Sequence, residues 1–157
     1  MPGGEGKGPS VIWVIDASVA LKWFLRFRAE EDHVPQAIAL LEQTLSGVAA
    51  SVQPPHFYVE MAAVLAREKP DTAREDMEDL LRLDFRLAEG PELYTLAIDL
   101  SRRYGHHLFD TLYHALALLH PEAVLVTADR RYFVKAQRED CIILLEDFYA
   151  SKNGYAR

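Results

Sequence analysis

The chain has 157 residues, of which 50% are hydrophobic and 26% charged, a composition typical of one globular domain. Its apolar runs are far too short to cross a bilayer, so no membrane association is expected. The net charge of −7 argues against a broad nucleic-acid-binding face, unless the acids bind metal or the basic residues are grouped.

The predicted elements alternate between short strands and longer helices. The runs at 11–15 and 123–126 are apolar without alternation, as strands buried on both faces are. Helix ends are placed by residues such as Ser18, a predicted cap, and Gly47, a stop. In chain order we predict a strand at 11–15, helices at 18–27 and 30–45, a weak strand at 48–52, helices at 56–68 and 72–83, a short strand at 85–88, helices at 91–104 and 108–119, a strand at 123–126, a helix at 129–137, a strand at 141–145 and the start of a helix at 147–149.

This alternation predicts an α/β layer fold with a mainly parallel sheet, in which ligands bind beyond the carboxyl ends of the strands. We predict one domain at 11–150, a disordered or tag-like N-terminus at 1–10 and a flexible tail at 151–157. The single cysteine, Cys141, excludes an internal disulfide and a cysteine-rich zinc site, and we expect it to be buried. A cytoplasmic location follows as the default expectation.

Four acids stand in otherwise apolar surroundings. Asp16 directly follows the first predicted strand, and Asp129 follows the strand at 123–126. Asp110 lies in the first turn of a predicted apolar helix, and Glu60 is the only charged residue between positions 55 and 67. An acid in such a segment is costly to bury without a partner.

Each acid also has a plainer interpretation. Asp16 and Asp129 fit helix caps, and Asp110 fits the positive end of a helix. Glu60 fits a solvated helix face or a pair with Arg67. Taken together, however, several acids directed at one sheet edge would repel each other, and a divalent cation removes that repulsion. Oxygen ligands favour Mg²⁺ or Mn²⁺, and such clusters support phosphodiester hydrolysis.

Four segments, in this order, resemble those of PIN-domain proteins, particularly the VapC-type toxins of toxin–antitoxin pairs. Any one segment is a weak indication, but the ordered set spans nearly the whole chain, roughly 11–148. The segments are VIDASVALKWF at 14–24, the helix around Glu60 at 55–67, LFDTLYHALA at 108–117 and LVTADRRYF at 125–133.

The resemblance implies a three-layer α/β/α sandwich with a mainly parallel sheet of about five strands, and a Mg²⁺- or Mn²⁺-dependent endoribonuclease. By the family pattern, Asp16, Glu60 and Asp110 are the core metal ligands, and Asp129 completes the acidic and catalytic set. Thr127 stands where the family often has a small hydroxyl or acidic residue near the metal. The resemblance further implies an RNA substrate, an antitoxin protein as partner, and a homodimer.

Some supporting residues match the pattern and one departs from it. Ser18 is placed to hold the first aspartate through a hydrogen bond. Ala63 stands where the family often carries an asparagine, so a supporting hydrogen bond is missing there. Lys22, Arg130 and Arg131 flank the predicted site and could contact RNA phosphates, although solvation at the surface explains them equally well.

A group of histidines surrounds Asp110. His107 and His114 form a candidate zinc pair, but zinc usually has more histidine or cysteine ligands, so we expect His114 to be a packed or hydrogen-bonded helix residue. His106 belongs to the same group.

Two rival functions stay open at this point. One is a haloacid dehalogenase-like phosphohydrolase with Asp16 as nucleophile, although such enzymes normally carry a second aspartate where this chain has Ser18. The other is a PIN-like fold that acts as a non-catalytic binding scaffold, although degenerate members usually lose one or more of the acids.

Overall fold

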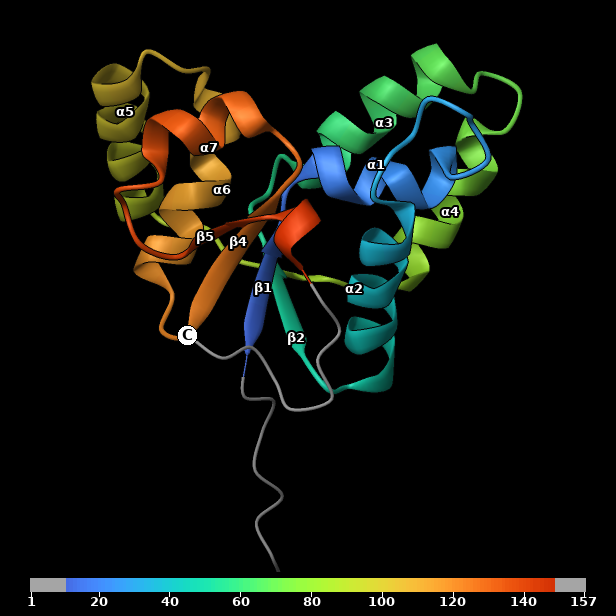
Figure 1. Ribbon diagram of the computed structural model, residues 1–157, viewed down its shortest axis with the longest axis horizontal. Coiled ribbons are helices and arrows are strands. Elements are labelled where there is room, and N and C mark those ends of the chain that lie inside the picture. Colours follow the sequence, from blue (N-terminus) through green and yellow to red (C-terminus); the bar gives the residue numbers. More distant parts are fainter. Residues whose placement is uncertain (1–10, 149–157) are drawn as a thin grey trace, which may run out of the picture.

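The computed structural model describes residues 11–148, so the predictions for the two termini lie outside the described residues (Figure 1). Its elements, in chain order, are β1 (Ile12–Ile15), α1 (Ala17–Leu25), α2 (Val34–Ser46), β2 (Ala50–Gln53), α3 (Phe57–Glu68), α4 (Ala73–Arg82), β3 (Arg86–Leu87), α5 (Pro91–Tyr104), α6 (Leu108–Leu119), β4 (Ala123–Thr127), α7 (Arg130–Ala136), β5 (Ile142–Leu144) and a 3₁₀ helix, η1 (Leu145–Asp147).

The five strands form one parallel sheet in the order β3-β2-β1-β4-β5. β1 is central, and its residues Val14 and Ile15 are fully buried, as expected for an apolar strand covered on both faces. At the carboxyl end of β1, the Gln53 side chain replaces a backbone partner. Its amide donates to the carbonyl of Ile15 and its oxygen accepts from the Ile15 amide, both at 2.7 Å.

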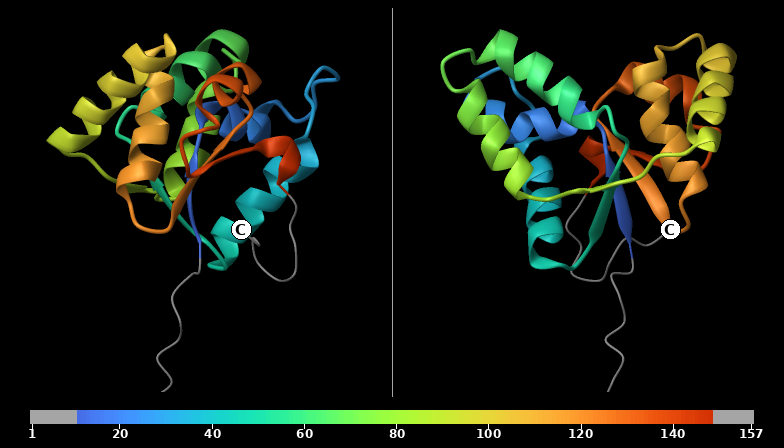
Figure 2. Two further views of the ribbon diagram at one scale, coloured as in Figure 1. Left: turned by 60° about the vertical axis from the view of Figure 1, so that its left-hand side comes forward. Right: turned by 180° about the vertical axis from the view of Figure 1, so that it is seen from behind.

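Helices cover both faces of the sheet, which confirms the predicted α/β architecture. Figures 1 and 2 show α1 to α4 on one side and α5 to α7 on the other, with the carboxyl ends of β1 and β4 between the two groups. The core includes Trp13 of β1, Phe57 of α3 and Tyr113 of α6, all buried. No helix in the described part of the chain is long and apolar enough to span a membrane.

The start of the second helix is predicted wrongly. α2 begins at Val34 and not at residue 30, because the preceding residues form a loop held by an ion-paired lysine. His33, the residue before α2, has a left-handed backbone with φ 52°, and Pro35 stands in the first turn, where proline is favoured. The proline was the sequence feature that marked the true start.

Three smaller predictions also need correction. Ser18 lies inside α1, and Asp16 occupies the position before its first residue. The last strand ends at Leu144, and a 3₁₀ turn follows at once in place of a helix from residue 147. Cys141 is half-buried and packs at the edge of the core, because it occupies a left-handed turn with φ 65° just before β5.

Candidate active site

The carboxyl edge of the sheet brings together the ends of four elements, each carrying one of the acids. Asp16 follows β1 and Asp129 follows β4, as their strand-end positions predict. Asp110 and Glu60 lie in the first turns of α6 and α3. The carboxylate of Asp16 interacts electrostatically with Asp110 and Glu60, and Asp110 interacts with Asp129 and Glu60.

Asp16 is the most deeply buried of the four, at 6% exposure. Its backbone is fixed by a hydrogen bond from its amide to the carbonyl of Val126, and its carbonyl accepts from the amide of Val19. The hydroxyls of Ser18 and Thr127 both donate to its Oδ2 atom at 2.7 Å, so the expected Ser18 hydrogen bond is present.

The carboxyl of Asp16 holds its proton unusually tightly. Burial raises its pKa from 3.8 to about 7; the Ser18 and Thr127 hydroxyls oppose the rise, and the charges of Asp110 and Glu60 add to it. A cation bound beside the Asp16 carboxylate would therefore offset much of the free-energy cost of burying its negative charge.

The two hydroxyls also fix the loop after β4. The Thr127 hydroxyl accepts from the amide of Asp129 at 3.0 Å, and the Ser18 hydroxyl accepts from the amide of Ala128 at 3.1 Å. The loop that carries Asp129 is thus tied to the same two side chains that hold Asp16. Ser18 and Thr127 orient both acids together.

One side chain, that of His106, contacts both Asp110 and Asp129. The Nε2 atom of His106 lies 3.0 Å from Oδ2 of Asp110 and 3.4 Å from Oδ2 of Asp129. One donor atom from each of these three residues lies within 4.8 Å of the other two. Burial raises the pKa of Asp110, and the charges of Asp129 and Glu60 add to the rise, while His106 opposes it.

The capping interpretation is correct for Asp129 and incorrect for Asp16. One carboxylate oxygen of Asp129 accepts from the amide of Tyr132 at the start of α7. Its other oxygen, Oδ2, is the one that faces His106. The side chain of Asp16 makes no capping hydrogen bond to α1.

Glu60 faces the acid cluster and does not pair with Arg67, which contacts its neighbour Glu68. Its Oε1 atom is buried and lies 2.8 Å from Nε2 of His56, outside hydrogen-bond geometry. The Tyr113 hydroxyl is also buried, near Glu60, and no well-formed hydrogen bond from the described residues satisfies it. Burial raises the pKa of this phenol, and the charges of the acids add to the rise.

These residues fit a divalent cation. Within residues 11–148, neither lysine nor arginine forms an ion pair with any of the four acids. Two acids have raised pKa values, and buried oxygens of Glu60 and Tyr113 lack well-formed hydrogen bonds. Oxygen donors of this kind are the ligands that Mg²⁺ and Mn²⁺ prefer.

The three predicted substrate-binding residues, Lys22, Arg130 and Arg131, differ in their burial and in their ion pairs. Lys22 is buried and bonds to Glu31 at 3.1 Å and to the carboxylate of Asp32 at 2.8 Å. Arg130 pairs with Glu146 across a neighbouring pocket. Arg131 is exposed on α7.

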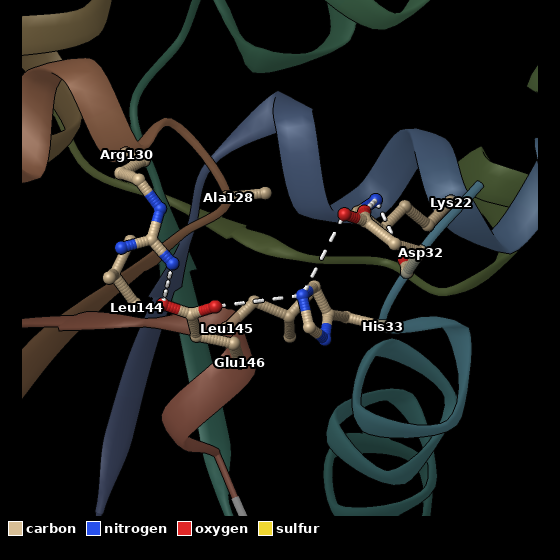
Figure 3. A pocket seen from close by; sticks show the side chains of 8 residues that line it. All are labelled: Lys22, Asp32, His33, Ala128, Arg130, Leu144, Leu145 and Glu146. Carbon is tan, nitrogen blue, oxygen red and sulfur yellow. Dashed lines mark hydrogen bonds and ion pairs between the residues drawn. The ribbon is translucent and has the colours of Figure 1, made fainter. Parts of the chain in front are cut away.

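This neighbouring pocket has a volume of about 220 Å³ and lies beside the loop after β4 (Figure 3). The ring of His33 stands across it, with Nε2 3.7 Å from the carboxylates of both Asp32 and Glu146. Figure 3 shows these side chains as one chain of polar contacts from Lys22 through Asp32, His33 and Glu146 to Arg130. The basic side chains of this pocket, Lys22, His33 and Arg130, therefore already lie against carboxylates. The pocket is lined by Lys22, Asp32, His33, Ala128, Arg130, Leu144, Leu145 and Glu146.

The histidines do not form the zinc pair that their spacing allowed. His107 precedes α6 and accepts from the amide of Phe109 through Nδ1. His114 is buried, bonded to the Tyr132 hydroxyl at 2.7 Å and to the carbonyl of Asp140 at 2.9 Å, which confirms its predicted packed role. Burial lowers its pKa.

Sequence reasoning missed two side chains at the cluster, His56 and Tyr113, and did not single out His106 from its neighbours. The spacing of four residues between His106 and Asp110, and between His56 and Glu60, was the available indication. It is a weak one, because side chains four residues apart meet on any helix.

Comparison with protein families agrees with this geometry. The family model described as "PIN domain" matches residues 13–139, a stretch that contains all four acids. No match was found among curated proteins. The match covers most of the chain and includes the strands and helices that carry the cluster, so the chain belongs to the PIN domain family.

Proposed function

We propose that this protein is a metal-dependent endoribonuclease, the cytoplasmic toxin of a toxin–antitoxin pair, that uses Mg²⁺ or Mn²⁺. The observation that carries the proposal is the convergence of Asp16, Glu60, Asp110 and Asp129 at one sheet edge without a basic counter-ion from the described residues. PIN-domain proteins are typically metal-dependent nucleases, and this chain has the acids which that chemistry requires.

Each acid has a defined task in this proposal. Asp16, Glu60 and Asp110 hold the cation, and Asp129 completes the set. When bound, a divalent cation lowers the pKa of an attacking water and stabilises the negative charge that develops on the phosphate. Thr127 keeps Asp16 and the loop of Asp129 in register through its hydroxyl, so the ligands are oriented before the substrate arrives.

Phosphate contacts are assigned to the exposed basic residues beside the cluster. Arg131 is exposed and lies two residues after Asp129 with no ion pair among the described residues, so it is the best placed of the three predicted residues. Arg130 would first have to leave Glu146, and Lys22 is buried in its own ion pairs. The antitoxin partner and the homodimer rest on the resemblance to VapC-type toxins alone.

The test is incubation of the purified protein with total RNA in Mg²⁺, in Mn²⁺ and with a chelator. Cleavage is expected with metal and not with chelator. Asp110→Asn should lower the rate by at least about 100-fold, because removing a ligand weakens metal binding at least as much as removing a residue behind it. Asp99→Asn, an exposed acid on α5, is the matched control and should cleave normally.

Other outcomes would support the rival functions. Normal cleavage by Asp110→Asn, or cleavage in chelator, would show that the site is assigned wrongly. A wild-type protein that binds no metal and cleaves no RNA would favour a binding scaffold. A covalent aspartyl-phosphate on Asp16 would favour a phosphohydrolase.

A further inference from the structure

The side chain of His106 brings a nitrogen atom to the acid cluster, beside two of its carboxylates. Its Nε2 atom lies 3.0 Å from Asp110, in the first turn of α6, and 3.4 Å from Asp129, in the loop after β4. The side chain is only 10% exposed, and its ring packs against Tyr132 with centroids 4.9 Å apart. The ring of His106, largely covered and held by this packing, presents its Nε2 atom to the cluster.

Charged groups approach the ring of His106 from both sides. The Lys135 ammonium lies 3.3 Å from Nδ1 of His106 and donates to the carbonyl of Gly105 at 3.1 Å. An ammonium has only donors, so Nδ1 must offer a lone pair and the ring proton must reside on Nε2, toward Asp110. The charged groups that face the ring are therefore Lys135 on one side and the two carboxylates on the other.

Resting on the proposed function, we infer that Nε2 of His106 is a ligand of the bound cation and makes the site prefer Mn²⁺ over Mg²⁺. Mg²⁺ takes oxygen ligands in strict geometry, whereas Mn²⁺ stands above it in affinity for imidazole nitrogen. For Nε2 to act as a ligand, its proton would first have to pass to water, and Nδ1 would take up a proton from water in exchange. Lys135 must then leave Nδ1, which means that this lysine opposes metal binding.

The other histidine at the cluster is not equally available. Nε2 of His56 lies 2.8 Å from the backbone carbonyl of Phe109, which would lose this partner if Nε2 bound a cation, and 2.8 Å from Oε1 of Glu60, outside hydrogen-bond geometry. Nε2 of His106, in contrast, faces two carboxylates that are themselves proposed ligands. His107 uses its Nδ1 to accept from a backbone amide at the start of α6. His106 is thus the histidine that the geometry selects.

The test uses the full chain, stripped with chelator and titrated with Mn²⁺. Pulsed electron paramagnetic resonance of the bound Mn²⁺ should show coupling to an imidazole ¹⁴N nucleus in the wild type and in His107→Asn, a control that keeps a side chain able to cap α6. His106→Ala should lose this coupling. Competition with Mg²⁺ should show the preference for Mn²⁺ falling by about tenfold in His106→Ala.

A second variant tests the opposing role of Lys135. Lys135→Gln removes the ammonium and supplies an oxygen that accepts from Nδ1–H, so Mn²⁺ affinity should rise, by about tenfold at most. Bound Mn²⁺ without ¹⁴N coupling in the folded wild type, or coupling retained in His106→Ala, would overturn the inference and leave the nuclease proposal standing. A wild type that binds no Mn²⁺ at all would remove both.

Discussion

Replacing Asp16 with asparagine should stabilise the metal-free protein, and by more at pH 8 than at pH 5. Burial raises the pKa of this carboxyl from 3.8 to about 7 in the folded chain. The folded state therefore binds the proton more tightly than the unfolded state, and stability falls as the pH rises from about 4 through 7. Asparagine stays neutral, so it escapes this loss, and its oxygen can still accept from the Ser18 and Thr127 hydroxyls.

The magnitude follows from the same two pKa values. At pH 8, where Asp16 is ionised in both states, its raised pKa lowers the free energy of unfolding by about 4 kcal/mol. At pH 5 the folded carboxyl is protonated and the unfolded one is ionised, and the loss is smaller, between about 1 and 2 kcal/mol. The advantage of Asp16→Asn should thus grow by roughly 3 kcal/mol between the two pH values, and any constant effect of the amide group cancels in that difference.

The assay is urea unfolding of both proteins in chelator at pH 5 and pH 8. His114, whose pKa is lowered by burial, makes stability fall at acid pH, but it is present in both proteins and drops out of the comparison. Asp99→Asn on the exposed face of α5 should show no such pH-dependent gain. A gain for Asp16→Asn that is equal at both pH values, or larger at pH 5, would refute the reasoning.

Three further variants probe the packing around the cluster by urea unfolding in chelator. Thr127→Val loses the hydrogen bonds to Asp16 and from the Asp129 amide and should cost about 1–3 kcal/mol; an unchanged midpoint would contradict this role. His114→Phe leaves a buried hydroxyl and a carbonyl without their partner and should also cost about 1–3 kcal/mol, which His114→Gln should partly restore. Tyr113→Phe should change stability by less than about 1 kcal/mol, because its hydroxyl has no well-formed hydrogen bond to lose, and a larger loss would reveal one.

The sheet and the place of the acids were predictable because both depend on local patterns. Apolar runs without alternation marked β1 and β4, and the acid after each run had to emerge at the carboxyl edge of a parallel sheet. Asp110 and Glu60 stood out as lone charges in apolar helices, a pattern that is stable only where something compensates the charge.

What the sequence did not indicate depends on contacts between distant residues. Lys22 has the spacing of a site residue, but its partner Asp32 lies ten residues away in a loop whose shape no periodicity predicts. The same contact explains why α2 starts late. The tautomer of His106 depends on Lys135, 29 residues further along the chain, so its relation to the cluster emerges only in three dimensions.

In the proposed nuclease, the net charge of the chain would couple metal binding to RNA binding. The chain carries 24 acidic and 17 basic residues, and RNA is repelled by the excess. Lys22 and Arg130 are already paired with carboxylates, so they add little net attraction for a phosphate. A cation held by the four acids would remove repulsion at the point where the proposed substrate's scissile phosphate would bind. Because linkage is reciprocal, RNA that binds the loaded site must also tighten the hold on the metal, and the two ligands occupy the site together more readily than either does alone.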